Sequence, residues 1–366
     1  MNLIKNYIDG NKTAISSDSI PVNDPSTGEI ISHVVLSNEE DFKIAIESSK
    51  RSQVEWTNTT PLRRSRILSN YKNLIELNMQ TLAEIVSKEH GKTIDDAKGS
   101  ITRGLEVVEF ACGIPHLLKG EFSQNVGTNI DSWSIRQPIG VSAGITPFNF
   151  PAMVPMWMYP LSIACGNSFI LKPSEKDPSC AIKLAELFSE AGLPDGVLNV
   201  VNGDKKIVDL ILNSSDISSV SFVGSTPIAK YVYETASKNL KRVQSLGGAK
   251  NHLVVMPDAN IDQSVDGIMG AAFGSAGERC MAVSVAVAVG DIADKLVEKI
   301  DLKCQKLRVA PWTDSESDMG PVISKDHKEK IENYISAGVK EGASLIEDGR
   351  NYKIQGYENG YFVGPT

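Results

Sequence analysis

A cysteine that directly follows an arginine is a candidate nucleophile in this chain. It is Cys280 in the stretch GSAGERCM, residues 274–281, where small residues and a glutamate precede Arg279. A reactive cysteine needs positive charge close to its thiolate, whereas a buried structural cysteine is inert and prefers apolar neighbours. Arg279 is such a positive neighbour in sequence, although adjacency alone leaves both interpretations open.

Polar residues also follow several predicted strands, and open α/β sheets bind ligands just beyond the carboxyl ends of their strands. Asn149 in TPFNFP lies between Pro147 and Pro151. Its amide could donate to a developing oxyanion or could close a local turn. Lys172 and Glu175 in LKPSEK could hydrogen-bond the ribose hydroxyls of a nucleotide, or could belong to a solvated charged loop.

The stretch VSFVGSTPIAK predicts a strand that runs into a helix through Gly224 and Ser225. Pro227 stands at the favoured first position of that helix, whose free N–H groups would form an anion site unless the helix is an ordinary capped one. Neither G-x-G-x-x-G nor G-x-x-x-x-G-K-[ST] occurs, so neither a Rossmann fingerprint nor a P-loop is predicted.

Ser142 in GVSAG matches the G-x-S-x-G pattern of the hydrolase nucleophile elbow. That elbow needs a sharp strand-to-helix turn at the serine. Here the strand-like run continues to Ile145, so we predict a strand and reject a serine hydrolase.

The elements that position these residues follow from the periodicity. Ser37 and Glu40 predict a capping box at the start of a helix, and His90 followed by Gly91 predicts the end of another. Turn residues between two short alternating runs predict a hairpin within residues 121–138.

After Gly140 predicted strands alternate with predicted helices, which indicates parallel βαβ units. The predicted strands lie at residues 140–146, 167–172, 196–201 and 218–223, and the helices at 153–165, 180–191 and 206–213. A second set comprises strands near 252–257 and 282–290 with a helix at 262–277 between them.

The length of 366 residues predicts two domains or one large α/β unit. A formal net charge of −8 argues against nucleic acid or an anionic membrane as the main partner. Five scattered cysteines indicate free thiols in a reducing cytosol, and no zinc-type spacing predicts a metal site. The start MNLIKNYIDGNK lacks a signal core, so we expect a cytoplasmic protein.

The ordered set PFNFP, LKPSE, GLPDGVLNVVNG, FVGSTPIAK, LGGAKNH and GERCMA resembles the aldehyde dehydrogenase superfamily over nearly the whole chain. Within it, FACGIPHLLKGE and GERCMA are similar to the CoA-acylating methylmalonate-semialdehyde (malonate-semialdehyde) dehydrogenase branch. The resemblance implies an α/β fold with a parallel-sheet NAD-binding domain at 1–245 and an α/β catalytic domain at 246–366. It also implies that the hairpin at 121–138 joins subunits of a homotetramer.

The resemblance further implies that Cys280 attacks the aldehyde to give a thiohemiacetal. Its oxyanion would be stabilised by Asn149 and the backbone N–H of Cys280. Hydride would pass to NAD, and the acyl group, after loss of the distal carboxylate as carbon dioxide or bicarbonate, would pass to coenzyme A. Residues implied to contact NAD are Thr146, Phe148, Lys172, Glu175, Lys176, Ser225 and Gly247.

Two arginines are candidates for the substrate carboxylate, since a guanidinium fork can hold two oxygens. Arg279 would support thiolate or substrate charge, and the resemblance places Arg103 at the substrate entrance. Alternatively Arg103 only pairs with Glu106, three residues further along the helix.

Two departures from the family pattern keep alternatives open. Hydrolytic relatives carry a general-base Glu before LGG, where this chain has Ser245, which favours transfer to a thiol over hydrolysis. The chain stops at GYFVGPT, whereas the family continues through a Glu-Ile-Phe-Gly-Pro segment and a final strand, so we expect a C-terminally incomplete catalytic domain. A hydrolytic dehydrogenase for another acid semialdehyde, and an inactive fragment that only binds NAD or subunits, remain the alternative functions.

Overall fold

The computed structural model describes residues 2–366, which form two compact units. Unit 1 comprises residues up to Ile20, His33–Leu82 and Ser100–Gly247. Unit 2 comprises Pro21–Ser32, Ala83–Gly99 and Gly248–Thr366. The division differs from the predicted boundary after residue 245, because two segments from the first hundred residues belong to unit 2.

Unit 1 is built on a seven-stranded sheet with the order β12-β11-β8-β9-β10-β2-β3. Its strands are β12 (Arg242–Leu246), β11 (Ile217–Val223), β8 (Val141–Ile145), β9 (Ser168–Lys172), β10 (Leu198–Val200), β2 (Asn6–Ile8) and β3 (Asn11–Thr13). The first five are parallel, and β2 and β3 add antiparallel edges. Every residue of β8 and β9 is buried, as expected for parallel strands covered on both faces.

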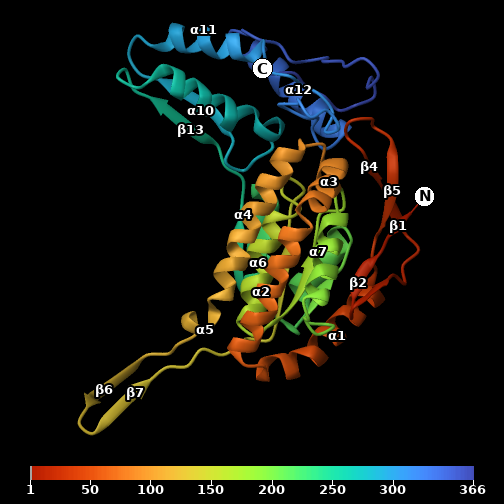
Figure 1. The fold of residues 1–366 in the computed structure, drawn as a ribbon, viewed down its shortest axis with the longest axis vertical. Helices are drawn as coiled ribbons and strands as arrows, with labels where there is room; N and C mark the ends of the chain where they lie inside the picture. The colour runs from red at the N-terminus through yellow and green to blue at the C-terminus, as the bar shows by residue number, and fades with distance from the viewer. Residues whose placement is uncertain (1) are drawn as a thin grey trace. The chain divides into compact units, whose positions relative to one another are not determined.

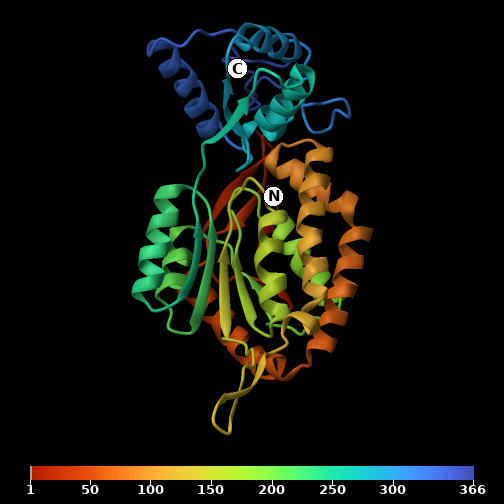
Figure 2. The same ribbon diagram turned by 90° about the vertical axis from the view of Figure 1, so that its left-hand side faces the viewer.

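Helices cover both faces of this sheet (Figures 1 and 2). One layer contains α1 (Glu39–Asn58), α8 (Lys205–Asn213) and α9 (Thr226–Lys238). Their buried apolar side chains join those of β8 and β11 in one core cluster. The other layer contains α2 (Pro61–Leu77), α6 (Met153–Ala164) and α7 (Ser179–Glu190), and α4 (Ile94–Cys112) packs on α6 through Gly104.

The second layer is held by buried aromatic rings. Tyr71 of α2 stacks on Phe188 of α7, with ring centroids 4.0 Å apart. The hydroxyl of Tyr71 also hydrogen-bonds that of Tyr159 on α6. Each buried hydroxyl therefore has a partner, which avoids the cost of an unsatisfied polar group.

The start of α1 corrects the predicted capping box by one residue. Asn38 is the N-cap: its Oδ1 accepts from the backbone N–H groups of Glu40 (3.0 Å) and Asp41 (3.1 Å). Asp41 Oδ2 accepts in return from the N–H of Asn38 at 3.1 Å. The predicted pair of Ser37 and Glu40 is wrong because the Ser37 hydroxyl is buried against Asn6, 2.8 Å away.

Most other predicted elements of unit 1 are confirmed. Ser142 lies inside the fully buried strand β8, and its Oγ accepts from Ser219 Oγ at 2.9 Å, so no nucleophile elbow forms there. Gly144 is required in that strand, since a Cβ would come within 2.7 Å of the Phe169 ring. Helix α9 starts at Thr226, so Pro227 is its second residue, not the predicted first.

The predicted hairpin is present as β6 (Phe122–Gly127) and β7 (Ile130–Trp133), and it projects from unit 1 (Figure 1). Phe122, Val126, Ile130 and Trp133 are all more than half exposed on it. The remaining short elements comprise the sheet β1-β5-β4 (Leu3–Ile4, Ile30–Val35, Ser19–Asn23), α3 (Met79–His90) and α5 (Ile114–Leu117).

Unit 2 contains a parallel pair of strands, β13 (Asn251–Val255) and β14 (Val283–Ala288), connected through α10 (Ile261–Phe273) and the 3-10 turn η1 (Gly274–Gly277). Helices α11 (Ala293–Cys304) and α12 (Lys325–Lys340) follow. The segment 21–32 joins this unit through backbone bonds such as Tyr361 N–H to Pro25 O, 2.9 Å.

Neither a membrane-spanning helix nor a cluster of metal-binding side chains occurs in the part of the chain that the structure describes. In residues 2–366 no helix combines the length and apolar character needed to cross a bilayer. Over the same residues, no group of three or more His, Cys, Asp and Glu side chains is arranged to hold a metal ion.

Candidate active site

The carboxyl ends of the parallel strands of unit 1 lie side by side and carry most of the predicted cofactor residues. Ile145 at the end of β8 is in register with Phe222 of β11 and with Lys172 at the end of β9. Leu246 of β12 is in register with Val223 of β11. The loops that follow these strands therefore emerge from the same edge of the sheet.

Lys172 and Glu175 form an ion pair at this edge, with Nζ 2.9 Å from Oε2. Lys172 is buried, and the Glu175 side chain is 35% exposed. Burial alone would raise the pKa of Glu175, but the charge and hydrogen bond of Lys172 outweigh it and lower that pKa. The pair is thus a fixed, charged feature that can present donors and acceptors to hydroxyl groups.

The loops after β8 and β9 contact each other. The N–H of Thr146 donates to the carbonyl oxygen of Lys172 at 3.1 Å. The ammonium of Lys176 lies 5.3 Å from the centre of the Phe148 ring, within the range of a cation–π contact. Asn149 follows Phe148, in the partly buried turn that leads to α6.

Ser225 and Gly247 lie at the other end of this edge. Ser225 is the N-cap of the 13-residue helix α9 and makes no side-chain capping bond. Gly247 lies close to the first turn of α9, because a Cβ at this position would come within 3.1 Å of Thr226 Oγ1. The small side chains leave the helix N-terminus accessible, which is the arrangement that binds anionic groups.

Ser245, the second-last residue of β12, hydrogen-bonds the neighbouring helix α9. Its hydroxyl donates to the carbonyl oxygen of Ala229 in α9 at 2.7 Å. The hydroxyl is therefore engaged in holding β12 to α9.

In unit 2 the predicted nucleophile ends a tight loop, Gly274–Cys280. Ser275 and Ala276 have φ of +51° and Gly277 has φ of +75°, so three successive residues are left-handed. A non-glycine residue in this region costs about 1–3 kcal/mol and persists where its surroundings hold it. Cys280 is exposed, and its carbonyl oxygen accepts from Asn251 Nδ2 at 2.9 Å.

Arg279 is held by an aspartate that is distant in sequence. Its Nη2 forms an ion pair with Oδ1 of Asp96, on the first turn of α4, and its Nη1 donates to the carbonyl oxygen of Gly270 at 3.2 Å. The second oxygen of Asp96 accepts from the N–H of Ser275 at 2.9 Å. Asp96 therefore binds both ends of the loop that precedes Cys280.

Glu278 forms a second attachment of the same loop. Its carboxylate, 2% exposed, accepts from the N–H of Ile323 at 3.2 Å and lies 3.4 Å from His327 Nε2. It also lies 3.6 Å from Nε2 of His90, the last residue of α3. Burial, followed by the charges of Lys92 and His327, holds the pKa of His90 well below its usual value.

Arg103 is exposed on α4, and its Nε lies 3.5 Å from Glu106 Oε2. The alternative ion pair considered from the sequence is therefore present. Exposed pairs of this kind contribute little to stability, so the guanidinium can exchange partners at small cost.

Sequence patterns did not identify Asp96, Glu278 or His90 as part of the site. Asp96 has the ordinary signature of an acidic residue in a first helical turn, and His90 that of a basic residue in a last turn. Glu278 stands beside the predicted nucleophile, which is a signal for it in the sequence.

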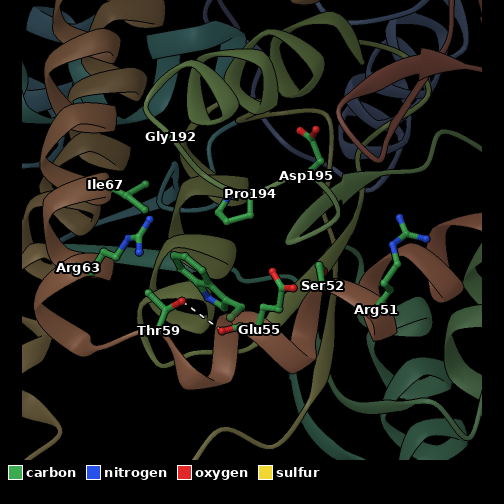
Figure 3. A pocket seen from close by; sticks show the side chains of 10 residues that line it. Arg51, Ser52, Glu55, Thr59, Arg63, Ile67, Gly192, Pro194 and Asp195 are labelled. Carbon is green, nitrogen blue, oxygen red and sulfur yellow. Dashed lines mark hydrogen bonds between the residues drawn. The ribbon is translucent and has the colours of Figure 1, made fainter.

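A separate pocket of about 320 Å3 lies between α1, α2 and the loop that enters β10. Figure 3 shows the guanidinium groups of Arg51 and Arg63 on opposite sides of it. Arg51 is paired with Asp9 at 2.6 Å. The pocket lies at the amino end of β10, so it is distinct from the edge that carries the cofactor candidates.

Comparison with known proteins gives a consistent match. Residues 13–366 match the model of the aldehyde dehydrogenase family. A malonate-semialdehyde dehydrogenase of Pseudomonas aeruginosa is 53% identical over 365 residues, covering 100% of this chain and 73% of the relative. Another of that name from Halalkalibacterium halodurans is 50% identical, covering 99% and 75%.

Solved structures match equally well. A crystal structure assigned as a methylmalonate-semialdehyde dehydrogenase of Sinorhizobium meliloti 1021, complexed with NAD, has 55% identity and a TM-score of 0.98, covering 100% of this chain and 74% of that chain. The methylmalonate-semialdehyde dehydrogenase of Oceanimonas doudoroffii has 53% identity and a TM-score of 0.98, covering 100% and 75%. The resemblance and the α/β fold predicted from the sequence are confirmed.

Proposed function

This chain belongs to the aldehyde dehydrogenase family, and from that premise we propose that it oxidises malonate or methylmalonate semialdehyde with NAD and transfers the acyl group to coenzyme A. The names of the relatives support the substrate class. One observation carries the proposal furthest: of the five cysteines, all within the described residues, only Cys280 is exposed.

The carboxyl edge of the unit 1 sheet fits NAD. The Lys172–Glu175 pair offers a donor and an acceptor for ribose hydroxyls, and the α9 N-terminus beside Ser225 and Gly247 offers N–H groups for a pyrophosphate. NAD, when bound, supplies the acceptor for the hydride that leaves the substrate. The NAD complex of a relative with 55% identity supports this assignment.

The chain itself supplies the nucleophile. The thiolate of Cys280 forms a bond to the aldehyde carbon, and the carbonyl oxygen takes the negative charge. We assign the backbone N–H of Cys280 and the side-chain amide of Asn149 to stabilise that oxyanion. After the hydride has left, the acyl group remains on Cys280 as a thioester.

We propose that coenzyme A, not water, releases this acyl group. Hydrolysis needs a general base to activate water. Ser245 stands where hydrolytic relatives carry a glutamate, and its hydroxyl is bonded to the Ala229 carbonyl. The thiol of coenzyme A displaces Cys280 and yields an acyl-CoA, once the distal carboxylate has left as carbon dioxide or bicarbonate.

Two arginines are assigned to the substrate carboxylate and the local charge. Arg103 can release Glu106 at little cost because both are exposed. Arg279 keeps further N–H groups beside those that bind Asp96 and Gly270. We also propose that unit 1 is the NAD-binding part and unit 2 the catalytic part, and that the apolar hairpin β6–β7 joins subunits of a tetramer in the cytoplasm.

The test is product analysis with malonate semialdehyde and NAD, in the presence and absence of coenzyme A. We expect NADH and acetyl-CoA in stoichiometric amounts, and little free acid without coenzyme A. Cys280→Ser abolishes both products, while Cys165→Ser, at a partly buried cysteine, leaves them unchanged. Free acid formed at the same rate without coenzyme A favours the hydrolytic alternative instead.

A further inference from the structure

We propose that Asp96 is a positioning residue for Cys280: it fixes the Gly274–Cys280 loop and holds the guanidinium of Arg279, the residue before the nucleophile, against the start of that loop. The inference rests on the proposed function in one respect, that Cys280 is the nucleophile. Asp96 is distant in sequence from the loop, yet one of its oxygens binds the second residue of the loop and the other binds the residue before Cys280.

The first contact holds the loop backbone. Ser275 is buried, and its N–H donates to Asp96 Oδ2 at 2.9 Å. Ser275 and Ala276 are non-glycine residues with left-handed backbones. Such a conformation is kept only where contacts from outside the loop maintain it. Asp96 supplies such a contact, and it comes from a different element, α4.

The second contact holds the guanidinium of Arg279 against the loop. A Cβ on Gly274 would come within 2.5 Å of Arg279 Nη1, so the side chain folds back over the start of the loop. Side-chain exposure is 32% for Arg279 and 17% for Asp96, so the pair is partly shielded from water. Asp96 thereby offsets part of the positive charge of Arg279, the residue next to Cys280 in the sequence.

A matched control lies next to Asp96. Asp95 is exposed and shares the first turn of α4, where both carboxylates favour the helix dipole. Asp95→Asn therefore removes a charge from the same helix end without removing a loop contact. Cys112 and Cys165, both partly buried, report any general loosening of unit 1 in the same sample.

Hydrogen exchange tests the backbone contact. In Asp96→Ala, the amide of Ser275 is expected to exchange at least about tenfold faster than in the parent chain, because a hydrogen bond to a charged acceptor is lost. In Asp95→Asn it exchanges at the parent rate. An unchanged Ser275 rate in Asp96→Ala, or equal acceleration in both variants, overturns the proposal.

Alkylation by iodoacetamide at pH 7, located by peptide mapping, tests the effect on the nucleophile. Asp96→Asn leaves the Arg279 charge uncompensated, so Cys280 is expected to react about threefold or more faster, while Cys112 and Cys165 keep their rates. The double variant with Arg279→Gln loses this acceleration. A change that affects all three cysteines alike indicates a merely structural role and refutes the assignment.

Neither measurement depends on turnover, which separates this inference from the proposed function. A chain that shows both effects but forms no NADH contradicts the proposed function and leaves the role of Asp96 in place. In an active chain, Asp96→Ala should lower kcat by about tenfold with little change in the KM for NAD, since misplacing a reacting group acts on the chemical step.

Discussion

The stability of unit 2 should decrease as the pH falls, because of one buried histidine. His90 is fully buried, and it faces Glu278, His327 and Lys92. Its pKa is held well below 6.5, chiefly by burial. Below about pH 6.5, therefore, His90 is protonated in the unfolded chain but stays neutral in the folded chain. The stability that His90 contributes is present above about pH 6.5 and is lost as the pH falls below that value.

The magnitude follows from one proton. When the folded state takes up no proton at His90, the free energy of unfolding decreases by about 1.4 kcal/mol for each pH unit below 6.5. Between pH 7.5 and 5.5 the parent chain should therefore lose about 1.4 kcal/mol more than His90→Gln, whose side chain does not titrate. Urea unfolding at both pH values measures this, and the constant cost of the substitution cancels in the difference.

The control is His116→Gln, at an exposed position on α5. It should follow the parent chain over the whole pH range. If His90→Gln loses as much stability as the parent chain between pH 7.5 and 5.5, then His90 takes up its proton in the folded state, and the reasoning from burial is refuted.

Two further predictions concern ligands. Lys172→Ala and Glu175→Ala should each weaken NAD binding by about 1–2 kcal/mol, which is the scale of a lost charge-assisted hydrogen bond. Calorimetric titration measures the affinity for NAD. An unchanged affinity in both variants would mean that the cofactor binds elsewhere. Arg103→Leu should lower kcat/KM for malonate semialdehyde by more than about tenfold but change kcat/KM for propanal little, because propanal has no carboxylate to bind. Steady-state kinetics compare the two aldehydes. An equal loss for both would mean that Arg103 supports the fold and not the substrate.

Local patterns predicted much of unit 1 because its elements depend on near neighbours. The strand from Val141 to Ile145 and the loop residues that follow it were found from alternation, prolines and glycines alone. The helix start at Asn38 was missed by one residue, since Ser37 and Asn38 are both good caps. Only the distant side chain of Asn6, which binds Ser37, decides between them.

The attachments of the nucleophile loop could not be predicted in this way. Arg279 and Asp96 are 183 residues apart, and no periodicity relates them. The rule that places a basic residue at a helix C-terminus describes the position of His90 correctly but omits Glu278, which its ring faces in the fold. For the same reason no local pattern indicates that residues 21–32 and 83–99 belong with unit 2.

The contact between Asp96 and Ser275 also imposes an order on protein synthesis. Ser275 is synthesised 179 residues after Asp96. At a synthesis rate of about 5–20 residues per second, the delay between the two residues is about 9–36 s. The parallel strands from Val141 to Leu246 all emerge during that interval. The sheet of unit 1 can therefore assemble on the ribosome. The segment 83–99 must avoid non-native contacts until the loop with Ser275 has been synthesised.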